Sequence, residues 1–378
     1  MGALSPAQVA QESGRRPTLR VLDLFAGAGG LSAGLRAAGG FHTVQAVELD
    51  PVAARTYKEN HGRTKVFAGS IQDWLTSDDI PDVDVIVGGP PCQGFSTLGK
   101  QDEEDERNAL WHEYAKTIAR AKPRYFLVEN VAVFLKSKQF ADFRTETERG
   151  GMLEDYTFRA AVLNAADFGA YQSRRRAVLI GHSRDLEFPG WPEAKWSDHH
   201  RTVAQAFRHI ETAVDGLDLP TGTVTVNGRE QPGVFTTEQL HISRHYEPIS
   251  VTRFSHIPPG GNRFHLPDHL KAPCWVRHTS GSADVMGRLR WDEPSVTIRT
   301  EFFKPEKGRY LHPEANRAIT HMEAAVLQGF PNSYRWVGSK VSIARQIGNA
   351  VPVPLGRALG FALTGRDIAD EPPTTVVA

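Results

Sequence analysis

Short apolar segments that alternate with segments of helical pattern make up the first half of the chain. The apolar segments are Leu19–Phe25, Thr43–Glu48, Val83–Val87, Tyr125–Val128 and Ala177–Gly181. Their length and β-branched content predict buried strands. The segments between them that predict helices include Val52–Asn60, Ala109–Ala121 and Phe158–Ala165. Strands that alternate with helices predict an α/β fold with a doubly wound, Rossmann-like parallel sheet.

This pattern changes near Asp185. Beyond it, Pro, Gly, His and Trp interrupt short segments, which predicts a smaller, loop-rich domain over residues 185–317. Helical signals return from Ala318, and we expect Gln346–Leu363 to form one helix that rejoins the first domain. The chain is therefore divided into a first domain over residues 1–184, the loop-rich domain, and a return segment over residues 318–378 that completes the first domain.

Composition describes an ordinary globular protein, with 44 basic and 44 acidic residues and no net charge. A nucleic-acid binder usually has a basic excess. Residues 241–309 do carry eleven Lys or Arg against seven Asp or Glu, although a solvated mixed surface would also account for this. No apolar stretch approaches the roughly 18 residues of a membrane span. The N-terminal segment Met1–Arg20 has no hydrophobic signal core, so we expect a cytoplasmic protein.

Two features of the first domain indicate a ligand that contains a nucleoside. The loop Phe25-Ala26-Gly27-Ala28-Gly29-Gly30 follows the first strand and precedes a helix, the setting in which glycines let the backbone approach a ligand. Glu48 ends the next strand, where its carboxylate can accept hydrogen bonds from both hydroxyls of a ribose. A tight turn followed by a solvent-exposed glutamate is the alternative interpretation.

The segment Pro90-Pro91-Cys92-Gln93 holds one of the two cysteines directly after a predicted buried strand. The prolines restrict the backbone, and the carboxyl end of such a strand is where open α/β sheets bind ligands. This placement favours a nucleophilic thiol, whereas a lone cysteine is more often a small buried apolar residue. The second cysteine, Cys274, lies 182 positions away and is expected to be a packed thiol; two cysteines so far apart predict neither a disulfide framework nor a metal site.

Five motifs then occur in a fixed order along nearly the whole chain. They are Asp23–Gly30, Pro90–Ser96, Glu129–Val131, Gln172–Arg176 and Gln346–Pro352. This series resembles the cytosine-C5 DNA methyltransferase family, of the bacterial modification type. The resemblance implies a Rossmann-like methyltransferase domain that depends on S-adenosylmethionine. It also implies a target recognition domain over residues 185–317, closed by a motif with Arg317, Glu323 and Gln328–Pro331.

The resemblance implies which residues bind S-adenosylmethionine. Phe25 would pack on the adenine, Ala28 and Gly30 would offer backbone to the methionine part, and Glu48 would hold the ribose. The remaining expected contacts are Gly27, Gly29, Leu49, Ile71, Pro91, Asn349 and Val351. Where the family commonly has an acidic residue near the adenine amino group, this chain has Ser70, and Asp73 is the alternative for that contact.

It also implies the catalytic residues. Addition of the Cys92 thiolate to carbon 6 of cytosine makes carbon 5 nucleophilic. Glu129 would supply a proton to ring nitrogen N3, with Asn130 orienting the loop. Arg176 would contact the cytosine O2. Arg174, two residues earlier on an extended segment, would point the same way and support Cys92.

The target cytosine must be flipped out of the duplex to reach Cys92. The loop 94–107 is the expected lid, with Ser96, Thr97 and Lys100 as contacts to DNA. We expect a monomer that acts on double-stranded DNA, with or without a cognate restriction endonuclease that cuts the same site and forms no stable complex with it. The alternatives are a transfer-RNA cytosine-C5 methyltransferase and a catalytically idle DNA- or cofactor-binding protein.

Overall fold

The computed structural model describes residues 18–77, 79–91, 110–214, 216–277 and 280–365. Cys92 and the loop 94–107, with Ser96, Thr97 and Lys100, lie outside these ranges, so the predictions made for them stay predictions. Within the described ranges, no helix has the length and apolar character that a membrane crossing would require.

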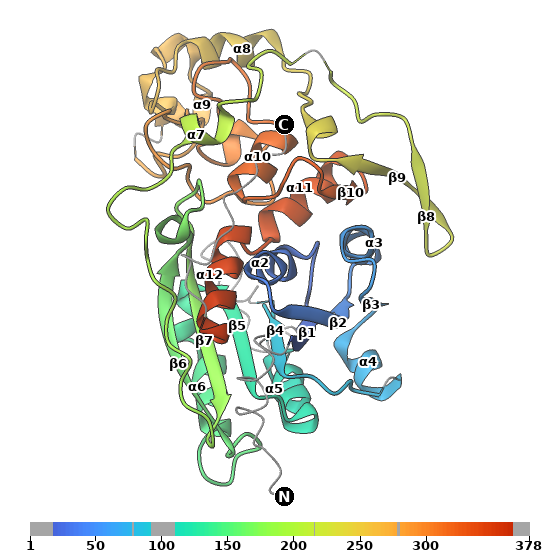
Figure 1. The fold of residues 1–378 in the computed structure, drawn as a ribbon. Helices are drawn as coiled ribbons and strands as arrows, with labels where there is room; N and C mark the ends of the chain where they lie inside the picture. Colours follow the sequence, from blue (N-terminus) through green and yellow to red (C-terminus); the bar gives the residue numbers. More distant parts are fainter. Residues whose placement is uncertain (1–17, 78, 92–109, 215, 278–279, 366–378) are drawn as a thin grey trace, which may run out of the picture.

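Seven strands of the described chain form one sheet, in the order β3-β2-β1-β4-β5-β7-β6 (Figure 1). They are β1 (Leu19–Leu24), β2 (Phe41–Glu48), β3 (Lys65–Ala68), β4 (Val85–Gly88), β5 (Tyr125–Val131), β6 (Tyr156–Asn164) and β7 (Arg175–Ser183). The strands from β3 to β5 run parallel. The chain winds from β1 out to β3 and then returns to β4 on the other side of β1, so the carboxyl ends of β1 and β4 form the switch point where such sheets bind ligands. The predicted α/β class is confirmed.

Three details of the predicted fold are wrong. Residues 158–165 do not form a helix, because most of them belong to β6, an edge strand that pairs with β7 over nine residues. The sheet is not wholly parallel, since β7 is antiparallel to both β5 and β6. The expected helix Gln346–Leu363 is two helices, α11 (Lys340–Asn349) and α12 (Val353–Thr364). Pro352 separates them, because proline has no N–H to donate and disfavours helical geometry in the residue before it.

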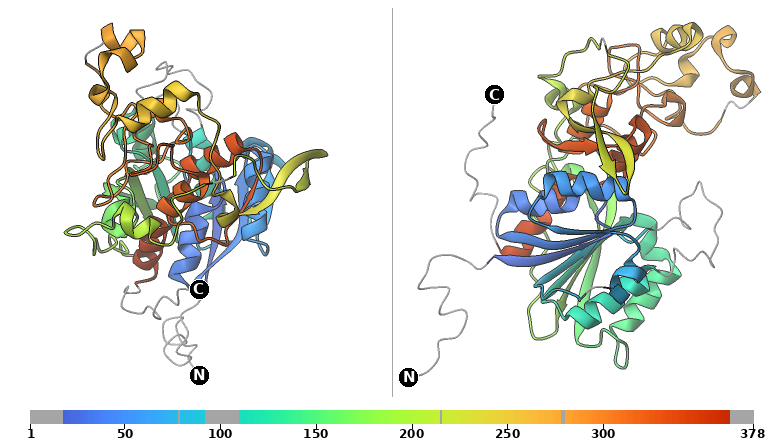
Figure 2. Two further views of the ribbon diagram at one scale, coloured as in Figure 1. Left: turned by 90° about the horizontal axis from the view of Figure 1, so that it is seen from above. Right: turned by 90° about the vertical axis from the view of Figure 1, so that its right-hand side faces the viewer.

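Helices cover both faces of the sheet (Figure 2). One face carries α2 (Gly30–Ala38), α3 (Pro51–Asn60) and α12, and the other carries α4 (Ile71–Ser77), α5 (Leu110–Ala121) and α6 (Lys138–Glu146). Neighbouring residues of a strand point to opposite faces. Val21 accordingly packs in a cluster with residues of α2 and α12, whereas Leu22 packs with residues of α4, α5 and α6.

The second lobe lies above the sheet in the view of Figure 1. Its helices and strands are α7 (Val203–Phe207), β8 (Thr223–Val226), β9 (Arg229–Thr236), α8 (Pro248–Ser255), α9 (Pro273–Arg277), α10 (His321–Leu327) and β10 (Arg335–Val337), together with α11. β10, β9 and β8 form a small antiparallel sheet in that order. Phe235 and Phe302 share a buried cluster with Leu327 and Trp336, so α10 and β10 contribute to the core of this lobe, whereas α12 packs on the large sheet.

Short 3-10 helices connect many of these elements. They are η3 (Ala132–Lys136), η4 (Ala165–Phe168), η5 (Glu238–Leu240), η6 (Arg263–His265), η7 (Asp268–Leu270) and η8 (Pro305–Lys307). Four of the six lie between residues 185 and 317, where the sequence predicted loop-rich structure.

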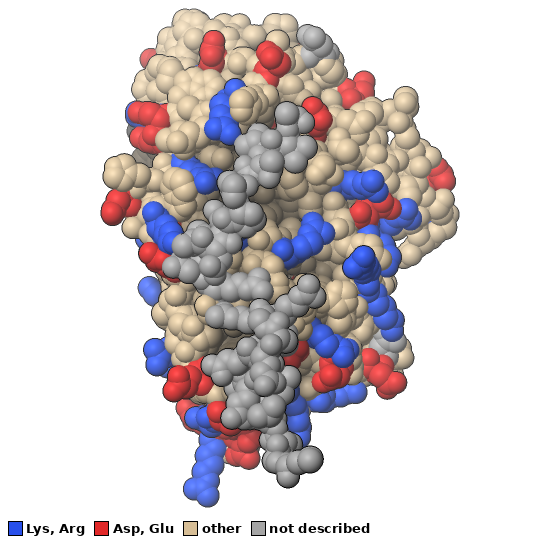
Figure 3. Space-filling model, viewed as in Figure 1, with Lys and Arg blue, Asp and Glu red and all other residues tan. Residues whose placement is uncertain are grey.

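The locally basic segment 241–309 is not simply a basic surface. Arg288 is 3% exposed, and its guanidinium donates to the carbonyl oxygens of Phe254, Ile257 and His312 at 2.7 Å each. On the face drawn in Figure 3, basic and acidic side chains are interspersed. Part of the positive charge of segment 241–309 is therefore buried inside the second lobe, where it is hydrogen-bonded to backbone carbonyl groups.

Candidate active site

The ends of β4 and β5 lie side by side, because Gly88 pairs with Val128 in the parallel ladder. Beyond these positions, Asn130 Nδ2 donates a hydrogen bond of 2.9 Å to the carbonyl oxygen of Pro90. Asn130 is 7% exposed, so water competes little for this bond. It ties the chain two residues before Cys92 to the carboxyl end of β5.

Glu129 and Arg176 form an ion pair beside this segment. Arg176 Nε, on β7, lies 2.9 Å from Glu129 Oε1, and the side chains are 14% and 10% exposed. Gly89 lies against the same carboxyl group, since a Cβ at that position would be 3.3 Å from Glu129 Oε2. The arginine thus holds the carboxyl group of Glu129 next to the segment that leads to Cys92.

Arg174 has a different environment from Arg176. Its side chain is buried, Nη1 donates to the carbonyl oxygen of Ile298 at 2.9 Å, and Nη2 donates to that of Gly348 at 3.1 Å. Burial, together with the charge of Arg176, lowers the pKa of Arg174 to about 9. Arg174 therefore stays charged at neutral pH and joins the end of the sheet to α11 and to the second lobe. Its Nε has no hydrogen-bond partner among the described residues.

The glycine-rich turn after β1 is held from several sides. The Ala26 N–H donates to the carbonyl oxygen of Val47 at 3.1 Å, and the Gly29 N–H donates to that of Ala26 at 3.0 Å. Gly27 and Gly29 have φ values of +54° and +91°, which glycine adopts without steric penalty. A Cβ at Gly27 would meet nothing within 4 Å among the described residues, so the turn has one open side.

Glu48 is fixed at the edge of this turn. Oε2 accepts the Gly27 N–H and Oε1 accepts the Asp50 N–H, both at 2.8 Å. Burial raises the pKa of Glu48, and the two N–H donors partly oppose that effect. Each carboxylate oxygen has a further lone pair, so both can still accept a hydroxyl of a ligand.

The other residues predicted to bind the cofactor differ in exposure. Leu49 is 68% exposed next to Glu48, which is unusual for so large an apolar side chain at a strand end. Asn349 is also exposed, Phe25 and Pro91 are half-buried, and Ile71 and Val351 are buried. An exposed apolar side chain, an anchored carboxylate and an open glycine turn fit the adenine, the ribose and the amino-acid portion of S-adenosylmethionine.

The alternative contacts Ser70 and Asp73 lie at the start of α4. Ser70 Oγ accepts the Asp73 N–H at 3.0 Å, and Ser70 is half-buried whereas Asp73 is exposed. The hydroxyl of Ser70 thus caps the first turn of this helix.

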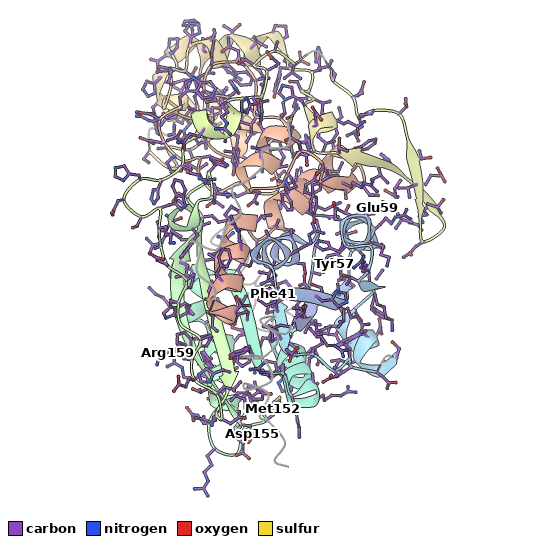
Figure 4. All side chains as sticks on the ribbon, viewed as in Figure 1. Phe41, Tyr57, Glu59, Met152, Asp155 and Arg159 are labelled. Atoms are coloured by element: carbon purple, nitrogen blue, oxygen red, sulfur yellow. The ribbon has the colours of Figure 1, made fainter. Side chains whose placement is uncertain are left out.

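Asp23, for which no individual role was predicted from the sequence, lies within β1 and is 1% exposed. Ser32 Oγ donates to Asp23 Oδ2 at 2.6 Å, and the Tyr57 hydroxyl, directed from α3 toward α2 (Figure 4), donates to Ser32 Oγ at 2.7 Å. Burial raises the pKa of Asp23 to about 7. An acidic residue inside a buried apolar strand is the sequence signal that could have revealed this network.

The expectation for Cys274 is wrong. The side chain lies in α9, which has no buried residue, and it is exposed. The helix is five residues long and begins at Pro273, and its Trp275, not Cys274, packs against the buried cluster that contains Phe254.

Known proteins match almost the whole chain. A family model described as C-5 cytosine-specific DNA methylase matches residues 19–364. The type II methyltransferase M1.HphI of Haemophilus parahaemolyticus is 33% identical over 358 residues, which cover 92% of this chain and 87% of that protein. The type II methyltransferase M.XorII of Xanthomonas oryzae pv. oryzae is 32% identical, with coverages of 90% and 83%. A solved structure of a putative DNA modification methyltransferase encoded within a prophage (E. coli) has a TM-score of 0.68 at 24% identity, covering 92% of this chain and 99% of that one.

Proposed function

Because this chain belongs to the C-5 cytosine-specific DNA methylase family, and so is a DNA (cytosine-5-)-methyltransferase that uses S-adenosylmethionine, we propose that it methylates a flipped-out cytosine through a covalent Cys92 adduct. The observation that carries the assignment of residues is the arrangement at the ends of β4 and β5. There, Asn130 holds the backbone of Pro90 and Arg176 holds the carboxyl group of Glu129, both next to the segment that enters Cys92.

The chemistry follows from these positions. The Cys92 thiolate forms a bond to carbon 6, and the ring electrons move toward N3, which takes a proton from Glu129. The positive charge of Arg176, near O2, stabilises the electron-rich ring. S-adenosylmethionine, held by Glu48 and the glycine-rich turn, would supply the methyl group to carbon 5 as an electrophile and would leave as S-adenosylhomocysteine. Water takes the proton from carbon 5, and the electrons of that bond re-form the ring double bond as the bond between sulfur and carbon 6 breaks. N3 returns its proton to Glu129, which restores the aromatic ring and leaves the Cys92 thiolate free.

The proposed cofactor site lies at the carboxyl ends of β1, β2 and β4. Glu48 accepts the ribose hydroxyls, Phe25 and Leu49 contact the adenine, and the backbone at Gly27–Gly30 faces the methionine portion. Ile71, Pro91, Asn349 and Val351 complete the site.

We assign sequence recognition to residues 185–317 and phosphate contacts to Ser96, Thr97 and Lys100. The bacterial relatives are named type II methyltransferases, which supports a modification role in a restriction-modification system. We therefore propose a cytoplasmic, nucleoid-associated monomer whose cognate endonuclease, where one exists, acts on the same site independently. Exchange of residues 185–317 for those of a relative should transfer the target sequence; an active chimera that keeps the original target would refute this division.

The activity is tested by incubating the purified protein with S-adenosylmethionine labelled in its methyl group and with duplex DNA or transfer RNA. We expect label in duplex DNA only, and bisulfite sequencing should place it at cytosines within one short sequence. Transfer to transfer RNA alone would favour the RNA enzyme, and binding without transfer would favour an idle DNA-binding protein. Either result would overturn the proposal.

A further inference from the structure

Tyr334, which follows α10, reaches across the molecule to the glycine-rich turn. Its hydroxyl donates a hydrogen bond of 2.6 Å to the carbonyl oxygen of Ala28, a residue 306 positions earlier in the chain. Both residues are 2% exposed. Their contact joins the segment that follows the loop-rich region to the turn that starts α2.

The hydrogen bonds fix the peptide between Ala28 and Gly29 on both sides. Its carbonyl accepts from the Tyr334 hydroxyl, and its N–H donates to the carbonyl oxygen of Ala26. Rotation of this peptide would break both bonds and would leave the buried carbonyl without a partner. The same turn carries the Gly27 N–H that anchors Glu48.

Side chains also fill the space behind Gly29. A Cβ at that position would lie 2.7 Å from His61 Nε2, 3.0 Å from the Tyr334 hydroxyl and 3.0 Å from Tyr57 Cδ2. The Tyr334 hydroxyl is itself 3.4 Å from His61 Nε2. Burial lowers the pKa of His61 to about 3, so the ring is neutral at physiological pH and places no charge behind the turn.

Tyr334 is held in turn by the core of the second lobe. Its ring centroid is 4.6 Å from that of Phe330 and 5.2 Å from that of Trp336 in β10. The carbonyl oxygen of Tyr334 accepts the Thr237 N–H at 2.8 Å. A movement of this aromatic cluster would therefore be transmitted to the glycine-rich turn.

We infer that Tyr334 is a positioning residue for S-adenosylmethionine. Its hydroxyl sets the orientation of the turn from Ala26 to Gly29, and this turn aligns the backbone N–H groups and Glu48 with the cofactor. Cofactor affinity thereby depends on a side chain that packs in the core of the second lobe. The inference rests on the proposed cofactor site, which includes Glu48 and the glycine-rich turn.

The test is calorimetric binding of S-adenosylhomocysteine, which the enzyme does not consume, to the full chain and to Tyr334→Phe. This substitution removes one oxygen atom and keeps the aromatic packing. We expect the dissociation constant to rise about tenfold, which corresponds to the loss of one buried hydrogen bond. In steady-state assays, the KM for S-adenosylmethionine should rise by a similar factor, whereas the KM for DNA should change less than twofold.

Tyr156→Phe is the matched control. Tyr156 is also buried, at 5% exposed, and its hydroxyl donates to the carbonyl oxygen of Pro123 at 2.8 Å, far from the glycine-rich turn. The Tyr156→Phe variant should lose about as much thermal stability as Tyr334→Phe and should bind S-adenosylhomocysteine like the wild type. Equal weakening in Tyr334→Phe and Tyr156→Phe would reduce the role of Tyr334 to general stability and would overturn the inference.

Two further variants separate the possible failures. Glu48→Gln should weaken binding if the proposed cofactor site is correct, and wild-type affinity in this variant would refute that site itself. Weak binding by Glu48→Gln together with wild-type binding by Tyr334→Phe would refute the inference alone. If Tyr334→Phe does not fold, Gly29→Ala disturbs the same contact from the side of the turn, and wild-type affinity in that folded variant would also overturn the inference.

Discussion

The sheet domain and the second lobe differ in how their buried backbone N–H and carbonyl groups are hydrogen-bonded. In the sheet, strand ladders pair the N–H and carbonyl groups, so the side chains of Glu129 and Arg176 at the strand ends form an ion pair with each other. In the second lobe, side chains donate hydrogen bonds to some of the backbone carbonyl groups. Arg309, for example, donates to the carbonyl oxygens of Gly260 and Gly261 at 2.7 and 2.9 Å.

This difference has a consequence for function. Glu129 and Arg176 are candidates for chemistry, because their ion pair is not part of the backbone pairing that holds the sheet together. Charged residues in the second lobe are divided between internal hydrogen bonds and the surface. Substitutions in the two regions should therefore reduce different quantities, which are turnover in the first and folding stability in the second.

The largest effect is expected for Glu129→Gln in the sheet domain. Glutamine keeps the shape of the side chain and has no proton to deliver to N3, so single-turnover methylation should slow by roughly 10²–10⁴-fold. The affinity for S-adenosylhomocysteine and the melting temperature should change little. Glu113→Gln in α5 is the control, because the Glu113 side chain is also largely buried, at 16% exposed, and also forms an ion pair, with Lys116 at 2.9 Å. It should methylate at the wild-type rate, and a rate for Glu129→Gln near that of this control would remove Glu129 from the mechanism.

Arg288→Met tests the second lobe. The substitution leaves several buried carbonyl groups unpaired, so the free energy of unfolding should fall by about 3–5 kcal/mol. Urea denaturation measures this loss. Arg290→Met is the control, because Arg290 is half-exposed and, among the described residues, forms one long ion pair of 3.7 Å, to Glu293. Equal free energies of unfolding for the two variants would show that the hydrogen bonds of Arg288 do not stabilise the second lobe.

A smaller and pH-dependent effect is expected at Asp23. Its pKa is raised from 3.8 to about 7 in the folded protein, so the unfolded state loses this proton at lower pH than the folded state does. The associated stability is fully present below about pH 4 and is lost as the pH rises to about 7, by on the order of 1 kcal/mol per pH unit.

Asp23→Asn should remove this part of the pH dependence, as measured by urea denaturation between pH 4 and pH 8. Asp82→Asn, at an exposed position of the same domain, should retain the wild-type slope. An unchanged slope in Asp23→Asn would show that Asp23 is ionised throughout this range. Asp23 would then be a buried charge inside β1.

The sequence predicts the sheet domain well because its signals are local. Runs such as Val83–Val87 are buried on both faces, and this continuous apolar pattern identifies the strand. β6 was missed because its residues are half-buried at the edge of the sheet, where the apolar pattern does not distinguish a strand from a helix. The break between α11 and α12 was missed although Pro352 marks it.

The contacts that position the candidate site are harder to predict. Tyr334 and Ala28 are 306 residues apart, and Arg174 reaches carbonyl groups 124 and 174 positions away. Hydrogen bonds from side chains to distant backbone groups leave no periodic pattern in the sequence. In the second lobe such bonds are numerous, so the sequence indicated irregular structure there without indicating which arginines are internal.

A DNA duplex with 5-fluorocytosine at the methylated position tests whether Cys92 forms a covalent bond to the target cytosine. Fluorine cannot leave carbon 5 as a cation, so the adduct cannot resolve after methyl transfer. We predict a conjugate of protein and DNA that resists denaturation, requires S-adenosylmethionine, disappears in Cys92→Ser and persists in Cys274→Ser. A conjugate that survives the loss of Cys92, or that mass spectrometry maps to Cys274, would contradict the account.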